Sequence, residues 1–268
     1  MTSTAITDDI STRYVRVEVE RGVALLTVDR PPANALDLDL VRELSAVVAT
    51  AGARTDVGAI VITGAGPRFV AGADIKMMRQ LDPSRFPEFI SGIQRAMDDI
   101  EAVPVPTIAA VNGHAMGGGM ELALACDMRF LAEGAKLGLP EVKLGLLPGA
   151  GGTVRLTELV GKGIAIELLL TGRPVEAEEA LRLRLINRVL PADQLVAEAV
   201  EYAAGLAAGP REAIAALKAS VLAELDGGRR AGFRTEAALV SRLFASEDAR
   251  EGIAAFVEKR PAVYRSGR

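Results

Sequence analysis

Two glutamates stand in sequence surroundings that are otherwise suited to burial. Glu121 follows three consecutive glycines and a methionine, and the residues after it are apolar. Glu141 lies in the apolar, loop-like segment LPEVKLGLLPGAGG at 139–152. An apolar environment disfavours the charged form of a carboxyl group and raises its pKa, which suits a general acid near neutral pH. Two such carboxyls can share a water molecule, one orienting it or taking its proton while the other delivers a proton.

Each glutamate also has a simpler interpretation when it is taken alone. An acidic residue in the first turn of a helix, the expected place of Glu121, is stabilised by the helix dipole. Glu141 alone is compatible with a solvated loop residue. Both glutamates, however, lie beside glycine-rich helix starts, and this repeated combination favours a role in chemistry.

Glycines gather in three loops, at 64–72, 117–119 and 149–152. Without side chains they let a ligand approach main-chain N–H groups, and the first turn of a helix offers such donors unpaired. The loops do not match nucleotide-binding fingerprints. Val154 stands where a dinucleotide motif needs its third glycine, and Gly161-Lys162-Gly163 lacks the spacer and the hydroxyl residue of a P-loop. Close packing of helices against strands is the alternative explanation for some of these glycines.

The composition argues against several other classes of function. The 268 residues include 31 Lys and Arg against 35 Asp and Glu, a net charge of −4, so no excess of positive charge favours binding to nucleic acid. One cysteine, Cys126, excludes an intrachain disulfide, and one histidine, His114, excludes metal sites that need two imidazoles. We find no secretory signal and no apolar run long enough to cross a membrane. We therefore expect a cytoplasmic protein without a nucleic-acid or membrane partner.

Hydrophobic periodicity divides the chain into an α/β part and a helical tail. Alternating or β-branched runs predict strands at 15–20, 23–28, 57–63, 108–111 and 128–132. Helices are expected at 37–51 and 118–126, with a helical region at 74–102 that is broken near Asp82-Pro83 and Pro87. After residue 173 strands nearly vanish, and helices are expected at 176–183, 192–208, 210–225, 229–245 and 247–257. We therefore predict a core with the active site at 1–190 and a helical oligomerisation region at 191–268.

Five segments, in this order, make the sequence similar to a known family. They are RPPANALD at 30–37, FVAGADIKMM at 69–78, AVNGHAMGGGMELALACD at 110–127, LGLPEVKLGLLPGAGGTVRL at 137–156 and EGIAAFVEKR at 251–260. With them the chain resembles the enoyl-CoA hydratase/isomerase (crotonase) family over residues 14–260. The resemblance implies an α/β fold, a crotonase-like spiral of repeated ββα units with a helical C-terminal region, assembled as homotrimers or homohexamers.

The family binds acyl-CoA thioesters and stabilises an enolate in an oxyanion hole made of two main-chain N–H groups. The match to AGAD and GGG implies that these donors are Ala71 and Gly118. The second assignment agrees with the residues themselves, because Gly118 opens a helix and its N–H is therefore unpaired. One such donor is typically worth about 3–4 kcal/mol in the transition state.

The resemblance also gives the two glutamates separate roles. It implies that Glu141 delivers a proton to Cα and that Glu121 holds and activates the water that adds at Cβ, with Gly149 contacting this water through its main chain. Both acids together favour an enoyl-CoA hydratase that forms a 3-hydroxyacyl-CoA. No metal and no redox cofactor are implied, since coenzyme A is part of the substrate. The alternatives are an enoyl-CoA isomerase, a hydroxyacyl-CoA lyase, or a non-catalytic acyl-CoA-binding protein.

Binding of the CoA moiety is expected from two parts of the chain. By resemblance, the wall of the CoA site includes Ala33, Ala73, Asp74 and Ile75. Two residues of the FVEKR segment, Phe256 and Lys259, resemble C-terminal residues that reach the CoA of a neighbouring subunit; a solvated charge cluster is the alternative. The acyl pocket is expected to include Met77, Met78, Leu81, Phe86, Phe89 and Ile90.

Overall fold

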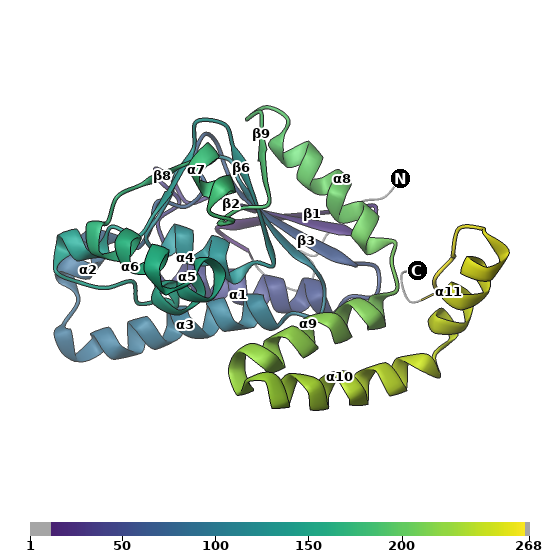
Figure 1. Cartoon of the computed structure of the whole chain (residues 1–268). Helices are drawn as coiled ribbons and strands as arrows, with labels where there is room; N and C mark the ends of the chain where they lie inside the picture. Colours follow the sequence, from purple (N-terminus) through teal and green to yellow (C-terminus); the bar gives the residue numbers. More distant parts are fainter. Residues whose placement is uncertain (1–11, 266–268) are drawn as a thin grey trace.

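A six-stranded sheet forms the centre of the computed structural model, which describes residues 12–265 (Figure 1). Its strand order is β1-β2-β3-β4-β6-β9. Only β1 runs antiparallel to its neighbour, and the other pairs are parallel. The strands are β1 (Val15–Glu20), β2 (Val23–Val28), β3 (Ala59–Gly64), β4 (Thr107–Val111), β6 (Met128–Ala132) and β9 (Arg188–Leu190).

A small second sheet completes the repeated unit of the fold. It has the order β5-β7-β8 and consists of β5 (Ala115–Met116), β7 (Lys136–Gly138) and β8 (Val175–Glu176). The chain passes from β4 in the large sheet to β5 in the small one and then enters helix α4 (Gly118–Ala125). A second passage, from β6 to β7, leads into the 3-10 turn η3 (Glu141–Leu144) and helix α5 (Gly152–Val160). The predicted spiral of ββα units is therefore confirmed.

Helices cover the large sheet on both sides. Figure 1 shows α1 (Leu38–Ala53) and α3 (Phe86–Ala102) below the sheet and α8 (Leu195–Ala207) above it. Helix α8 lies close to strands β2, β3, β4 and β6, and alanines such as Ala199 and Ala203 form its buried side. Small side chains let the helix lie near the strands. The first helix after residue 190 thus packs on the core, whereas the division of the chain at that residue stays a prediction.

The remaining helices follow the expected pattern with three differences. Helices α7 (Ala177–Arg182), α9 (Arg211–Gly227), α10 (Arg229–Phe244) and α11 (Glu247–Glu258) lie where the periodicity predicts them. The broken region contains α2 (Ile75–Gln80) and the 3-10 turn η2 (Pro83–Arg85). Pro87 does not break the chain, because it lies in the first turn of α3, where a missing N–H removes no helical bond. Helix α5 was expected only as a glycine-rich helix start without bounds, α6 (Lys162–Thr171) was not predicted, and β8 and β9 are strands after residue 173.

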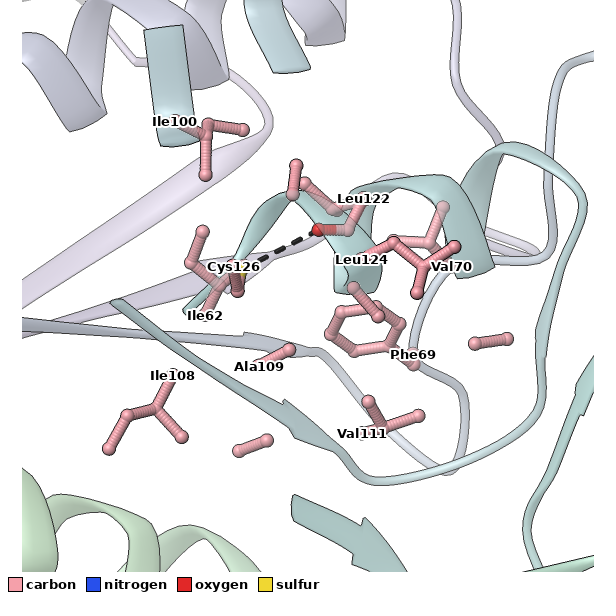
Figure 2. Packing of buried hydrophobic residues seen from close by; sticks show 14 of the residues in the cluster. Ile62, Phe69, Val70, Ile100, Ile108, Ala109, Val111, Leu122, Leu124 and Cys126 are labelled. Atoms are coloured by element: carbon pink, nitrogen blue, oxygen red, sulfur yellow. Dashed lines mark hydrogen bonds between the residues drawn. The ribbon is translucent and has the colours of Figure 1, made fainter. Parts of the chain in front are cut away.

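Helix α4 is held in the core on all sides, and its eight residues are buried. Figure 2 shows Leu122 and Leu124 of this helix among the buried hydrophobic side chains of the core, with Phe69 and Val70 close by. Cys126 follows the helix; its thiol donates to the Leu122 carbonyl at 3.5 Å, and burial raises its pKa to about 12. The cysteine is a core residue, and the helix that carries Glu121 is fixed by packing.

Within residues 12–265, no helix combines the length and the apolar character that a membrane span requires.

Candidate active site

A cavity of about 470 Å³ lies where the glycine-rich loops meet. Main-chain segments 71–73, 116–118 and 148–151 form part of its wall, together with Glu121 and Glu141. Much of the remaining wall is apolar. It includes Met78, Phe86, Phe89, Ile90 and Ile93. Four of the six residues expected in the acyl pocket line this cavity, and Met77 and Leu81 do not. The cavity therefore joins polar main chain and two carboxyls to an apolar surface.

The Glu121 carboxyl is buried and held by the backbone of another loop. Its side chain lies in the first turn of α4, and the residue is 4% exposed. Its Oε1 accepts a hydrogen bond from the Ala150 N–H at 2.7 Å and another from the Gly152 N–H at 2.9 Å. These two bonds fix the orientation of the carboxyl and leave its second oxygen available to the cavity.

Burial is the main cause of a large change in the acidity of Glu121. Desolvation disfavours the carboxylate, and the pKa of Glu121 is raised to about 7. The hydrogen bonds from Gly152 and Ala150 act in the opposite direction, as does the Arg155 guanidinium, while the charge of Glu141 raises the pKa further. Protonated and ionised forms of this carboxyl are therefore both accessible near neutral pH.

Glu141 reaches the same cavity with a carboxyl that is less tightly held. It begins the 3-10 turn η3, and its Oε2 is the one buried side-chain oxygen or nitrogen among residues 12–265 that has no hydrogen-bond partner. Burial raises the pKa of this carboxyl as well. A buried oxygen without a partner is costly unless a ligand or water contacts it. Glu141 therefore presents an oxygen without a partner where a bound molecule could contact it.

Gly117 is required where Glu141 approaches the start of α4. Its backbone has φ 52° and ψ −126°, a conformation that residues with side chains rarely adopt. A Cβ atom at this position would lie 2.6 Å from Glu141 Oε1. The sequence indicates the run of glycines. It does not indicate that Gly117 lies against the Glu141 carboxyl.

Two unpaired main-chain N–H groups lie close together at the cavity. One of them belongs to Gly118, as predicted, but the other belongs to Ala73 and not to Ala71. The Ala71 N–H donates to the Ala33 carbonyl at 3.2 Å, so it is not the free donor that we expected. The N–H groups of Gly118 and Ala73 have no hydrogen-bond partner within the described residues. The Ala73 nitrogen lies 3.6 Å from the position that a Cβ of Gly118 would take. The pair Ala73 and Gly118 therefore fits two adjacent donors better.

The orientation of Ala73 follows from the strand-like pairing of its loop. The Gly72 carbonyl accepts from Leu36, and the Asp74 N–H donates to Leu36. Since peptide groups alternate in direction along an extended segment, the Ala73 N–H points away from Leu36. Ala73 and Gly118 both line the cavity.

The other residues expected around CoA are divided between the cavity and its surroundings. Ile75 lines the cavity and is 52% exposed, whereas Ala33 and Asp74 are not part of the wall. The Asp74 carboxylate caps α2 by accepting from the N–H groups of Met77 and Lys76 and also pairs with Arg30. These hydrogen bonds and the ion pair lower its pKa. Asp74 thus has a structural role in shaping the loop.

The loop after η3 supplies functional groups that the sequence did not reveal. Gly149 lines the cavity as expected, but its carbonyl accepts from Gln94 Nε2 at 2.7 Å. The N–H groups that hold Glu121 belong to Ala150 and Gly152. The PGAGG segment drew attention to this loop, whereas nothing in the sequence indicated Gln94.

Phe256 and Lys259 lie outside the cavity. Phe256 belongs to α11 and is 85% exposed, and Lys259 ends that helix in the left-handed conformation. Neither residue lines the cavity. Figure 1 shows α11 at the opposite end of the molecule from α2 and α6. Within one chain the structure does not bring these residues to the site.

Among residues 12–265 no group of three or more His, Cys, Asp or Glu side chains is arranged so that it could hold a metal ion. His114 is exposed and does not line the cavity.

A spiral of ββα units with two carboxyls and two free main-chain donors in one cavity is an arrangement suited to a thioester-binding enzyme. Comparison with known proteins agrees. The family model described as enoyl-CoA hydratase/isomerase matches residues 18–267. The chain belongs to this family.

Individual relatives are similar over almost their whole length. A probable enoyl-CoA hydratase, echA8, of Mycobacterium bovis is 42% identical over 247 residues, which is 92% of this chain and 95% of the relative. A crotonyl-CoA hydratase of Syntrophomonas wolfei is 40% identical over 248 residues, with 92% and 95% covered. The crystal structure of an enoyl-CoA hydratase from Geobacillus kaustophilus superposes with a TM-score of 0.92 at 35% identity, covering 96% of this chain and 98% of that one.

Proposed function

We propose that this chain is an enoyl-CoA hydratase that adds water across the double bond of a trans-2-enoyl-CoA to give a 3-hydroxyacyl-CoA. The observation that carries the proposal is the pair of carboxyls in one cavity, both with raised pKa and differently bonded. Relatives that are about 40% identical and are described as enoyl-CoA or crotonyl-CoA hydratases support it.

The main-chain donors polarise the substrate in this proposal. The thioester carbonyl oxygen accepts hydrogen bonds from the N–H groups of Gly118 and Ala73. Negative charge on this oxygen grows as the thioester becomes enolate-like, so fixed donors bind the transition state more strongly than the ground state. The position of Gly118 at the start of α4 adds the positive end of the helix dipole.

The two carboxyls then move one proton each. The ionised Glu121 accepts a proton from a bound water through its free oxygen, and the water oxygen forms the new bond at Cβ. The protonated Glu141 gives its proton to Cα, so the double bond becomes a single bond and the enolate charge is removed. Proton exchange with solvent returns both acids to their initial states. The proposed reaction uses no metal and no redox cofactor.

Turnover of crotonyl-CoA tests the proposal directly. We expect loss of the absorbance of the conjugated enoyl thioester and a product that is heavier by one water, identified by mass spectrometry. A product of unchanged mass with a shifted double bond would indicate an isomerase instead. Binding without turnover at any chain length would indicate a non-catalytic acyl-CoA-binding protein, and cleavage of a hydroxyacyl-CoA into two fragments would indicate a lyase.

The assembly and the complete CoA site are a second part of the proposal. We propose a homotrimer or a hexamer of two trimers in which Phe256 and Lys259 approach the CoA bound by a neighbouring subunit. In the same chain Ile75 contacts this CoA from the cavity wall, and Ala33 and Asp74 lie next to that wall and shape its loops. Exposed apolar side chains near the end of the tail, Phe244 at 73% and Val257 at 73%, support burial between subunits. Light scattering is expected to give a multiple of three chains, and a monomer at micromolar concentration would contradict this.

A further inference from the structure

The loop that holds Glu121 accepts hydrogen bonds from two further side chains. Its N–H groups at Ala150 and Gly152 donate to the Glu121 carboxyl. The Gly149 carbonyl accepts from Gln94 Nε2 at 2.7 Å, and Gln94 itself lies at the cavity wall; the Ala150 carbonyl accepts from Arg155 Nη1 at 3.3 Å. The Gly149 and Ala150 carbonyls are therefore both bonded, while the N–H groups of Ala150 and Gly152 donate to the acid.

The bond from Gln94 acts on the same peptide group that binds the glutamate. The Gly149 carbonyl and the Ala150 N–H belong to one planar unit, so fixing the direction of the oxygen also fixes the direction of the N–H. A donor on the carbonyl polarises the peptide and strengthens the hydrogen bond that its N–H makes. Gln94, the Gly149–Ala150 peptide and Glu121 form a continuous chain of hydrogen bonds.

Helix α3 meets the loop at two positions one turn apart. A Cβ at Gly149 would lie 3.0 Å from Ile90 Cδ1, so the glycine approaches the helix as closely as its missing side chain allows. Gln94 lies four residues further on, on the same side of the helix. Ile90 therefore sets the distance between helix and loop, and Gln94 supplies the hydrogen bond that orients the peptide.

We infer that Gln94 is a positioning residue for the reaction: through the Gly149–Ala150 peptide it holds the Glu121 carboxyl in the orientation that water activation needs. The inference rests on the proposed hydratase function and adds to it a residue that acts from α3. A carboxyl held less firmly is a poorer partner for the water, since small displacements of a reacting group reduce the rate strongly.

Several charged groups face the same region and must be kept constant in a test. Glu141 approaches Glu121 from η3, and Arg155 approaches it from α5. Arg155 in turn pairs with Asp98 at 2.8 Å and Glu101 at 2.6 Å on α3. Gln94 is uncharged, so its replacement by methionine removes the donor and leaves all of these charges in place.

The experiment compares Gln94→Met with Arg95→Met, which changes the neighbouring exposed position of α3, using crotonyl-CoA as the probe. We expect Gln94→Met to lower kcat about tenfold with KM within about twofold of the unchanged protein. The acidic limb of the pH profile of kcat/KM is expected to move upward by about half a pH unit, because a weaker hydrogen bond favours the protonated carboxyl. Arg95→Met is expected to leave the rate and the profile unchanged.

The possible outcomes separate this inference from the proposed function. If the unchanged protein does not hydrate crotonyl-CoA, the proposed function fails. If it does, and Gln94→Met keeps the same kcat and the same acidic limb, the inference is overturned. Should Gln94→Met not fold, as judged by circular dichroism, Gln94→Glu replaces it, since its carboxyl donates only when protonated. The activity of Gln94→Glu relative to the unchanged protein is expected to fall as pH rises; a constant ratio would overturn the inference.

Discussion

The start of helix α4 and the 3-10 turn η3 each bring a glutamate to the cavity, but they hold it in different ways. Glu121 belongs to a helix that is buried along its whole length, and its Oε1 has two backbone donors. Glu141 belongs to a turn without a buried residue, and its Oε2 has no partner. The comparison teaches that burial alone does not assign a role, because hydrogen bonding distinguishes two carboxyls that burial affects in the same direction.

This difference agrees with the division of labour that we propose. A carboxyl fixed by two N–H groups is suited to holding a water at one place, because its free oxygen has a defined direction. A carboxyl on a turn without a buried residue, with an oxygen that lacks a partner, is suited to delivering a proton to a substrate atom. In this proposal Glu121 is oriented before the substrate binds, and Glu141 gains its contact from the substrate.

The largest effect is expected from removing either acid. Glu121→Gln and Glu141→Gln keep the volume of the side chain but remove proton transfer, and each is expected to lower kcat about 10²–10⁴-fold. Steady-state hydration of crotonyl-CoA measures both. A variant that retains full activity would show that its glutamate has no part in the reaction. The two glutamates would then not share the work in the way that we propose.

A smaller effect is expected from displacing Glu141 without removing its carboxyl. In Gly117→Ala the new methyl group meets Glu141 Oε1 and imposes strain at a positive φ. We expect kcat to fall about 10²-fold and the free energy of unfolding to fall by about 1–3 kcal/mol.

Gly134→Ala is the matched control for backbone strain at that glycine. Gly134 has φ +75°, no atom lies within 4 Å of the position that its Cβ would take, and the residue does not line the cavity. The variant is expected to lose stability without a comparable loss of kcat. Equal losses of activity in the two variants would show that strain, rather than the contact with Glu141, explains the result.

The pH dependence of stability sharpens the assignment of Glu121. Its pKa is about 7 in the folded protein against the ordinary value of 4.5, so the unfolded chain ionises first as pH rises. The folded state therefore loses stability between about pH 4.5 and 7, by about 3 kcal/mol in total, and no further above that range. The loss is absent below pH 4.5, where both states are protonated.

Urea unfolding of the unchanged protein and of Glu121→Gln at pH 5 and pH 8 measures this contribution. The variant is expected to lose less stability between the two pH values, because glutamine does not titrate. If both proteins change equally, the Glu121 carboxyl is not protonated on folding and the burial argument fails.

The smallest effect is expected at the other end of α4. Cys126→Ala removes a buried thiol that does not line the cavity. We expect kcat to stay within about twofold and the free energy of unfolding to fall by about 1 kcal/mol. In the unchanged native protein the thiol is expected not to react with a thiol reagent, since burial raises its pKa to about 12. Rapid labelling under native conditions would show that α4 opens and does not fix Glu121.

Much of the fold was predictable because local signals and burial agree. The strands near 15–20 and 128–132 have alternating or continuous apolar residues, and the structure contains them with those bounds. The bounds of helices α5 and α6 were missed because each helix begins directly after a glycine, in a glycine-rich segment that is typical of a loop. Three of their apolar side chains, Val154, Ile166 and Leu170, are exposed in one chain, so the apolar pattern of these helices matches burial within the chain only in part.

The candidate site was predictable at its acids and less so at its donors. Glu121 and Glu141 were identified from their apolar surroundings, and both line the cavity. The difference between Ala71 and Ala73 depends on which N–H pairs with residues 33–36, and this contact joins segments that are far apart in the sequence. Gln94 was not identifiable, because its role depends on a side chain meeting a carbonyl 55 residues away.

The double variant Glu121→Gln with Glu141→Gln tests most directly whether the two carboxyls act on one substrate in one step. Single-turnover rates for crotonyl-CoA would be measured for the unchanged protein, both single variants and the double variant. Groups that act as a unit give strongly non-additive losses, so we predict that the double variant is about as slow as the slower single variant. A loss equal to the product of the two single losses would show that the carboxyls act independently and would contradict the account.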